Sequence, residues 1–269
     1  MKNPKLRSSY LSRRTFATSA ARISGITKLN RYKIADLTVA MECFGETVLK
    51  QGKPYQTDAG SNADIRISIG KERLSAVKEK HPQMTLDGWE YILTGFDFSR
   101  ELISFDGFCL HASAVGLDGK AVLFSGPCGT GKSTHARLWR EVFGRDKEVI
   151  VINDDKPALR LIRDEVYVYG TPWSGKSHLH TNIKMPLQAI VFLKQAEKNE
   201  IRRLTNKEAV QMLVYQSLRP DRDTEKMEKL LSLLDRLLVR TPVYQLDCTV
   251  SHEAVRLVYN EINKVEKRD

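Results

Sequence analysis

Long apolar stretches are missing from this chain of 269 residues, and none approaches the roughly 18 uninterrupted apolar residues that a membrane-spanning helix needs. Cysteine is scarce too: only Cys43, Cys109, Cys128 and Cys248 occur, far apart and without a Cys-x-x-Cys pair. That spacing argues against a zinc site and against a disulfide framework. We therefore expect a soluble protein without a membrane span, in a reducing, cytoplasmic compartment.

Acidic residues are absent from residues 1–35, although this segment holds nine of the 43 Lys and Arg residues. Without it, 34 basic residues stand against 33 acidic ones, so the formal charge of +10 falls to about +1. The rest of the chain is therefore nearly neutral, and its charge gives no reason to expect a nucleic acid partner.

Residues 1–30 form a leader rich in Ser, Arg and Lys, for which three interpretations are open. Arg- and Ser-rich segments without acids are typical of organellar transit peptides. Residues 12–16, Ser-Arg-Arg-Thr-Phe, have the shape of a twin-arginine export signal, but Arg22 and Lys28 interrupt the apolar region that should follow. A disordered basic leader is the interpretation we favour.

The apolar pattern after the leader predicts two parts. Residues 31–106 form a small β-rich lobe, with strands over 34–41 and 65–69, an exposed charged stretch over 71–81 and a helix over 86–103. Residues 107–269 form an α/β domain. Its predicted strands cover 108–115, 121–125, 148–152, 158–162, 166–169, 189–193 and 243–246, and its helices cover 132–143, 207–217, 224–239 and 251–265. Two hairpins, around 118–119 and 163–165, predict a mixed, partly antiparallel sheet.

A glycine-rich motif lies between a predicted strand and a predicted helix. Its residues Gly126, Pro127, Cys128, Gly129, Thr130, Gly131, Lys132 and Ser133 match the Walker A pattern G-x-x-x-x-G-K-S/T, and Thr134 follows. Glycines let the backbone point N–H groups at phosphate oxygens, and the start of a helix adds the positive end of its dipole. Lys132 would reach the β and γ phosphates, and the Ser133 hydroxyl would bind Mg²⁺. The motif predicts a site for Mg·ATP.

An acidic pair, Asp154 and Asp155, ends the predicted strand over 148–152. A carboxylate at the end of a buried strand is the Walker B arrangement, in which it holds Mg²⁺ directly or through water. Two adjacent carboxylates offer one group for the metal and one to accept a proton from a substrate hydroxyl, and the sequence does not say which is which. A solvated turn is the alternative, because Asn-Asp-Asp is also a turn composition.

Three further features are candidates. His111 precedes the hairpin that leads into the motif, so it can return to the phosphate site or sit as an ordinary histidine in a half-buried strand. Residues 170–176 form a second glycine-rich loop that could close over a nucleotide or an acceptor, with Trp173 as a stacking wall and Lys176 against phosphate, or could simply connect two strands. His178 and His180 lack partners for a metal, and we expect them at the surface.

These residues resemble the C-terminal domain of the HPr kinase/phosphorylase family, which shares a P-loop fold with phosphoenolpyruvate carboxykinase. The resemblance covers about residues 108–193 and rests on Leu110-His111-Ala112-Ser113, the glycine-rich motif and the Asp154-Asp155 pair. The family has a histidine ahead of its P-loop, and His111 stands 15 positions before Gly126. The resemblance implies an α/β fold of this type, Mg·ATP as the nucleotide, and catalytic roles for Asp154, Asp155, His111 and Lys132.

The chain departs from HPr kinases after the second predicted hairpin. It has Tyr169-Gly170-Thr171-Pro172-Trp173 where those enzymes carry a Glu-x-Arg-Gly-type signature, which argues against HPr as the substrate. It resembles instead a smaller group of HPr-kinase-like proteins with a G-T-P-W-S-G-K loop, some relatives of which modify peptides. The resemblance implies a kinase that acts on a hydroxyl of a peptide, a protein or a small molecule. HPr kinases are hexameric, so it also implies a homo-oligomer.

Two other functions stay open. A non-catalytic nucleotide switch would keep the glycine-rich motif without turnover. A carboxykinase-like enzyme would act on a small carboxylic acid and would need a basic pocket, for which Lys156, Arg160 and Lys176 are the candidates.

Overall fold

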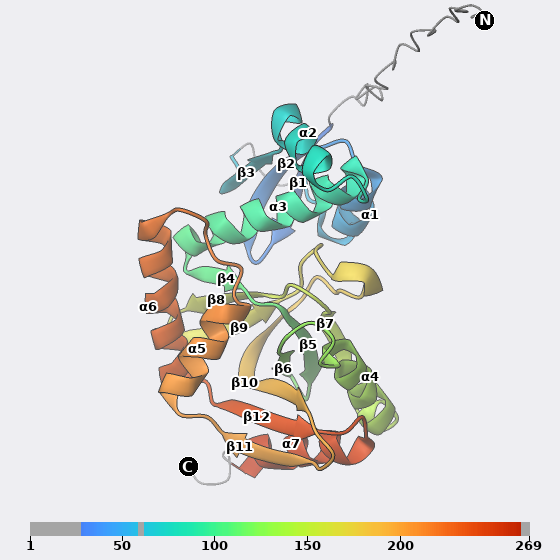
Figure 1. The fold of residues 1–269 in the computed structure, drawn as a ribbon, viewed down its shortest axis with the longest axis vertical. Helices are drawn as coiled ribbons and strands as arrows, with labels where there is room; N and C mark the ends of the chain where they lie inside the picture. The colour runs from blue at the N-terminus through green and yellow to red at the C-terminus, as the bar shows by residue number, and fades with distance from the viewer. Residues whose placement is uncertain (1–27, 59–61, 265–269) are drawn as a thin grey trace, which may run out of the picture.

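The computed structural model describes residues 28–58 and 62–264, which form an α/β fold with two mixed sheets (Figure 1). The leader predicted over residues 1–30 lies outside the described residues except for its last three, which begin β1. No helix in the described part of the chain is long and apolar enough to cross a membrane.

A three-stranded sheet and its helices make up the N-terminal part. The elements are β1 (Lys28–Ile34), β2 (Leu37–Cys43), α1 (Glu46–Gly52), η1 (Lys53–Tyr55), β3 (Ile65–Ser68), α2 (Lys71–Lys80) and α3 (Leu86–Leu102). β1 pairs antiparallel with β2, and β2 pairs parallel with β3. The small sheet that the sequence predicts is therefore present.

One prediction for this part is wrong. The strand expected over 34–41 is split into a hairpin, because Ala35 and Asp36 turn the chain with φ of 53° and 62°. The charged stretch over 71–81 is mostly exposed, as expected, and it forms the helix α2, which buries Leu74 in the core. The helix expected over 86–103 is confirmed as α3, which begins where the Thr85 side chain accepts a hydrogen bond from Gly88 N.

A nine-stranded sheet forms the larger part of the molecule, with four helices on its faces. Its elements are η2 (Ile103–Phe105), β4 (Gly107–Cys109), β5 (Ala112–Leu117), β6 (Lys120–Ser125), α4 (Lys132–Phe143), β7 (Ile150–Asn153), β8 (Ala158–Ile162), β9 (Glu165–Tyr169), η3 (Gly175–Ser177), β10 (Lys184–Gln195), β11 (Glu200–Arg203), α5 (Asn206–Gln216), α6 (Thr224–Arg240), β12 (Val243–Cys248) and α7 (His252–Lys264).

The long strand β10 joins two regions of this sheet. Its first residues pair antiparallel with β9, and its later residues pair parallel with both β6 and β12. β6 pairs antiparallel with β5, which pairs antiparallel with β7. The mixed, partly antiparallel sheet that the two hairpins predict is confirmed.

The strand predicted over 108–115 is interrupted at Leu110 and His111. β4 pairs with β8, whereas β5 pairs with β6 and β7, so the chain crosses between two regions of the sheet at this point. The backbone N–H of His111 donates to Gln216 O over 2.9 Å, outside any strand. The strand β11 was not predicted, because it has only four residues and one apolar side chain.

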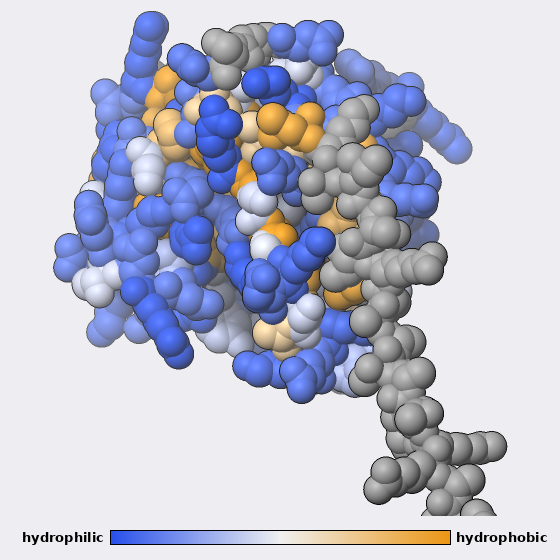
Figure 2. All heavy atoms as spheres, turned by 90° about the horizontal axis from the view of Figure 1, so that it is seen from above, coloured by the Kyte–Doolittle hydropathy of each residue, from blue (hydrophilic) through white to orange (hydrophobic). Residues whose placement is uncertain are grey.

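Helices cover both faces of the large sheet. α5 and α6 pack on one face through buried residues such as Leu213 and Leu234, and α4 and α7 pack on the other through Trp139 and Val258. Figure 1 shows these two pairs on different sides of the sheet, with α3 between the small sheet and the large one. From the end that carries the small sheet, the surface is mostly hydrophilic with separate apolar patches (Figure 2).

One hydrophobic cluster extends across both parts. It combines strands of the small sheet with Phe98 of α3 and with Cys109, Tyr169 and Trp173 of the larger part. The segment that contains Trp173 is therefore packed against the N-terminal part of the chain.

Candidate functional site

The glycine-rich loop, residues 126–131, connects β6 to α4, in the strand–loop–helix order that the sequence predicts. Gly126, Gly129 and Gly131 have φ of 144°, 83° and 95°, a region that glycine enters without steric cost. Gly131 is the N-cap of α4, and no side chain caps this helix. The first backbone N–H groups of α4 are therefore available to an anion, and the helix dipole favours negative charge there.

Lys132 is buried beneath this loop, with 8% of its surface exposed. Its ammonium donates to Gly126 O over 2.9 Å and to Pro127 O over 3.0 Å. Burial lowers the pKa of Lys132, while the neighbouring Cys128, Asp155 and Asp154 oppose that shift. A cation held among carbonyl groups at a helix N-terminus can turn to a phosphate chain as a stronger partner.

Asn153, the last residue of β7, shapes the turn that carries the acidic pair. Its Oδ1 accepts hydrogen bonds from the backbone N–H of Asp155 (2.9 Å) and of Lys156 (2.7 Å). Its Nδ2 donates to Thr171 O over 2.9 Å, which joins this turn to the loop 170–176. Sequence reasoning counted Asn153 as turn composition only, and its complete burial is what gives it a structural role.

The two carboxylates have different surroundings. Asp154 is buried, and its Oδ1 accepts a hydrogen bond of 2.5 Å from Ser113 Oγ on the neighbouring strand β5. Asp155 is more exposed: its Oδ2 lies 2.5 Å from Lys156 Nζ and its Oδ1 lies 3.5 Å from His111 Nε2. No role for Ser113 was predicted; the feature that could have indicated one is a hydroxyl side chain within a strand whose residues are all buried.

His111 occupies the break between β4 and β5 and faces Asp155. Its other ring nitrogen, Nδ1, lies 3.2 Å from Gln216 Oε1 at the end of α5. Burial and then the charge of Lys132 lower the pKa of His111, and Asp155 opposes this shift. Burial and the nearby ammonium of Lys132 therefore both disfavour the charged form of this imidazole.

A cavity of about 720 Å³ brings most of the predicted residues together. Those that line it are His111, Cys128, Gly129, Gly131, Lys132, Ser133, Thr134, Asp154 and Asp155. Gly126, Pro127 and Thr130 do not line it: Gly126 and Pro127 offer their carbonyls to Lys132, and Thr130 Oγ1 donates to Pro127 O over 2.9 Å.

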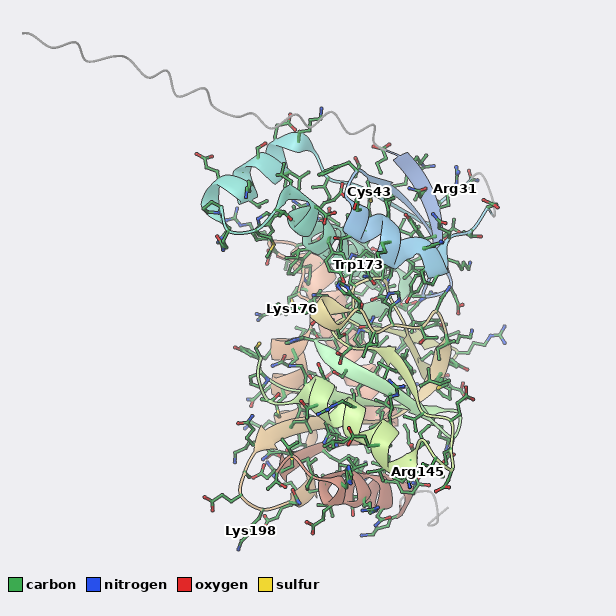
Figure 3. The ribbon with its side chains drawn as sticks, turned by 90° about the vertical axis from the view of Figure 1, so that its right-hand side faces the viewer. Arg31, Cys43, Arg145, Trp173, Lys176 and Lys198 are labelled. Atoms are coloured by element: carbon green, nitrogen blue, oxygen red, sulfur yellow. The ribbon has the colours of Figure 1, made fainter. Side chains whose placement is uncertain are left out.

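Residues Ser174–Ser177 of the second glycine-rich loop also line this cavity, but Trp173 does not. Trp173 is only 1% exposed, stacks on Phe98 with ring centroids 4.9 Å apart, and donates from Nε1 to Thr94 Oγ1 over 3.1 Å. The suggestion of a stacking wall is therefore wrong, because the indole is an anchor in the core. Figure 3 shows Trp173 inside the molecule, whereas the Lys176 side chain projects outward from the surface.

His178 and His180 both contact the N-terminal part of the chain. The Nε2 atom of Gln51, on α1, lies 2.7 Å from Nδ1 of His178. The Oε1 atom of Gln51 lies 2.7 Å from Nε2 of His180. His180 is half-buried and stacks on Tyr55, so the expectation that both histidines are surface residues is wrong for His180. Within the described residues, no group of three or more His, Cys, Asp or Glu side chains could hold a metal ion.

The cations suggested for a carboxylate pocket are not brought together. Lys176 lines the cavity, but Lys156 pairs with Asp155. Arg160 donates to Phe105 O (3.1 Å) and to Ala35 O (2.8 Å) and has a structural role.

Comparison with known families gives one extended match. Residues 97–256 match the family described as SynChlorMet cassette protein ScmC, and this stretch is more than half of the chain. The chain belongs to the ScmC family. The matched residues contain the whole cavity described above.

No curated protein matches the chain. Among solved structures, the HPr(Ser) kinase/phosphatase from Coxiella burnetii is similar over 59% of this chain and 98% of its own chain, at 13% identity and a TM-score of 0.35.

Proposed function

We propose that this ScmC-family chain is an Mg²⁺-dependent kinase that transfers the γ-phosphoryl group of ATP to a hydroxyl group. One observation carries the proposal: Lys132, Ser133, the acidic pair and His111, which come from separate segments, line a single cavity. Its volume of about 720 Å³ is within the range of small-molecule sites.

The phosphate chain would lie on the glycine-rich loop and the first turn of α4. The N–H groups at the start of α4 would hold its oxygens, and Lys132 would exchange its two loop carbonyls for the β and γ phosphates. This exchange is favourable because an ion pair with phosphate is stronger than a hydrogen bond to a carbonyl.

Ser133 and Asp154 would hold Mg²⁺. Both line a further cavity of about 350 Å³, which Asp155 does not line, so these two side chains face a common space. Hydroxyl and carboxylate oxygens are the ligands that Mg²⁺ prefers, and the ion would neutralise charge on the phosphates. The hydrogen bond from Ser113 would fix the orientation of the Asp154 carboxylate.

Asp155 would act as the base, because its carboxylate lies beside His111 and does not line the space that Ser133 and Asp154 share. It would accept the proton of the acceptor hydroxyl as that oxygen bonds to the γ-phosphorus. The bond between this phosphorus and the β–γ bridging oxygen breaks, and ADP leaves. His111 would stabilise the charge that develops on the transferred group.

The two carboxylates provide the test. Asp155→Asn should keep MgATP affinity and lower the turnover number by about two to four orders of magnitude. Asp154→Asn should instead raise the Mg²⁺ concentration needed for half-maximal binding. Calorimetric titration with ATP at several Mg²⁺ concentrations, together with ADP release, separates these effects. MgATP binding by the wild type without turnover on any acceptor would indicate a nucleotide switch and contradict the proposal.

A further inference from the structure

A second cavity, of about 490 Å³, adjoins the first and shares His111 and Cys128 with it. Its other lining residues are Pro127 of the glycine-rich loop, Phe96 of α3, and residues 215–219 and 221, which lie at the end of α5 and in the connection to α6. The second cavity is therefore open to the glycine-rich loop at the position of His111.

The connection after α5 is held firmly at this point. Gln216 O accepts a hydrogen bond from His111 N (2.9 Å), and Leu218 N donates to Cys109 O (3.0 Å). These bonds fix the segment against the break between β4 and β5. The position of the second cavity relative to His111 is therefore set by the backbone.

The direction of the phosphate chain decides which end of the first cavity meets the acceptor. Lys132 would reach the β and γ phosphates, whereas the N–H groups that follow it in α4 would hold the α and β phosphates. Thr134 would then lie toward the nucleoside, and it also lines the separate cavity with Ser133 and Asp154. The γ end would point toward His111, Pro127 and Cys128, all of which line the second cavity.

The rim of the second cavity has the composition of a recognition surface. Phe96 and Tyr215 are unusually exposed for aromatic residues, at 45% and 69%. Arg219 is exposed, and neither it nor Asp221 has a hydrogen bond or ion pair with the described residues. Aromatic residues and arginine are the types that contribute most to binding at protein and peptide interfaces.

We propose that the second cavity binds the phosphoryl acceptor, a peptide segment with its hydroxyl residue beside an apolar residue and a carboxylate. This inference rests on the proposed kinase function. The apolar side chain would pack on Phe96 and Tyr215, the carboxylate would pair with Arg219, and the hydroxyl would reach the Asp155 carboxylate beside His111. Asp221 on the same rim would repel a strongly acidic segment, so one carboxylate near the hydroxyl suits the site best.

The test uses the full chain, labelled ATP and short peptides that contain one serine beside a leucine and either an aspartate or a lysine. The wild type should prefer the aspartate peptides, and Arg219→Glu should reverse this preference. Tyr215→Ala and Phe96→Ala should each raise the KM for peptide about tenfold and leave MgATP affinity unchanged.

Arg236→Glu is the matched control, because Arg236 is an exposed arginine on α6 that lines neither cavity. It should leave the peptide preference unchanged. An unchanged preference in Arg219→Glu, or an unchanged KM in both aromatic variants, would overturn the acceptor site and leave the kinase function intact. Transfer only to small hydroxyl compounds would overturn it as well, whereas no transfer to any acceptor would overturn both proposals.

Discussion

Asp154 and Asp155 are neighbours in the chain, but their side chains face different groups. Asp154 is buried against the Ser113 hydroxyl, and Asp155 lies between Lys156 and His111. The turn that separates them is built by Asn153, whose side chain holds two consecutive backbone N–H groups. At the residue scale, the proposed division of work between metal binding and proton transfer therefore depends on one buried asparagine.

Ser113→Ala should weaken Mg²⁺ binding about tenfold and change the turnover number at saturating Mg²⁺ much less. The reason is that Ser113 Oγ contacts only one of the two carboxylates, and a group that orients a metal ligand acts mainly on metal affinity. Mg²⁺ dependence of ADP release measures the effect. Ser99→Ala is the control, because Ser99 is also a buried serine but lies on α3, outside the proposed nucleotide site. An equal effect of both substitutions on the Mg²⁺ dependence would contradict the prediction.

Lys132→Met should abolish measurable MgATP binding while the protein stays folded. Methionine fills the space of the buried lysine side chain but cannot form an ion pair with phosphate. The substitution removes only the two hydrogen bonds from Lys132 to the carbonyls of Gly126 and Pro127. Calorimetry with MgATP and thermal unfolding measure the two properties. A variant that binds MgATP as tightly as the wild type would contradict the role given to Lys132.

The sequence could group Lys132, Ser133 and the acidic pair as one candidate site, because their spacing is typical of phosphate-binding loops and their metal-binding partners. It could not predict the contacts of Ser113 or Gln216 with this site. Those contacts depend on the pairing of β5 with β7 and on the end of α5 reaching the β4–β5 break, both of which are long-range.

At the element scale, the loop 170–176 is positioned by a helix of the N-terminal part. Trp173 inserts against α3, where a Cβ on Gly95 would lie 2.9 Å from the indole ring, so only glycine fits there. Tyr91 of the same helix accepts a hydrogen bond from Ser174 N over 2.8 Å. The helix α3 therefore fixes the wall of the cavity that carries Ser174 and Lys176.

Trp173→Ala should lower the free energy of unfolding by about 3–5 kcal/mol, the usual cost of removing a large buried aromatic side chain. Urea unfolding measures it. Trp89→Ala on α3 is the matched control, and it should cost less because Trp89 is only half-buried. Equal losses in the two variants would contradict the anchoring role of Trp173.

Elements were predictable where the local pattern decides them. α4 has the predicted bounds because glycine ends the loop before it and apolar residues recur at helical spacing. The prediction of one strand over 108–115 was wrong because the apolar residues on both sides of the break are buried. Nothing in their composition indicates that the chain passes from one region of the sheet to the other at His111.

At the scale of the whole molecule, the small sheet and the large sheet are joined by polar contacts as well as by the shared core. Asp36 in the first hairpin accepts hydrogen bonds from Tyr169 (2.7 Å) and from Lys184 (2.9 Å). Gln51 of α1 contacts both histidines that follow the loop lining the cavity. The N-terminal part is therefore joined by side-chain contacts to the segment that follows the cavity-lining loop.

Stability should fall as the pH is lowered from about 7 to about 5, and His180 should contribute to this loss. Burial and then His178 lower the pKa of His180, so below about pH 6.5 the unfolded chain binds a proton more readily than the folded one. His180→Phe keeps a ring against Tyr55 but cannot titrate. Its free energy of unfolding should fall less over this range, and a slope equal to that of the wild type would contradict the prediction.

The layout of the whole molecule was the least predictable level. The sequence indicates an α/β fold with a mixed sheet, but the branching of the sheet at β10 depends on a strand that pairs with β9 along one half and with β6 and β12 along the other. Its first residues, Lys184–Pro186, carry no clear strand pattern. They form a strand because they pair with β9, and that pairing depends on the path of the loop that connects the two strands.

The most direct test of the central claim is transfer of the γ-phosphoryl label from ATP to serine peptides, by wild type and Asp155→Asn in the presence of Mg²⁺. We predict labelled peptide with the wild type, dependence of the transfer on Mg²⁺, and a loss of about two orders of magnitude or more in the transfer rate of the variant. Labelled peptide at equal rates with both proteins, or no labelled acceptor with the wild type, would contradict the claim.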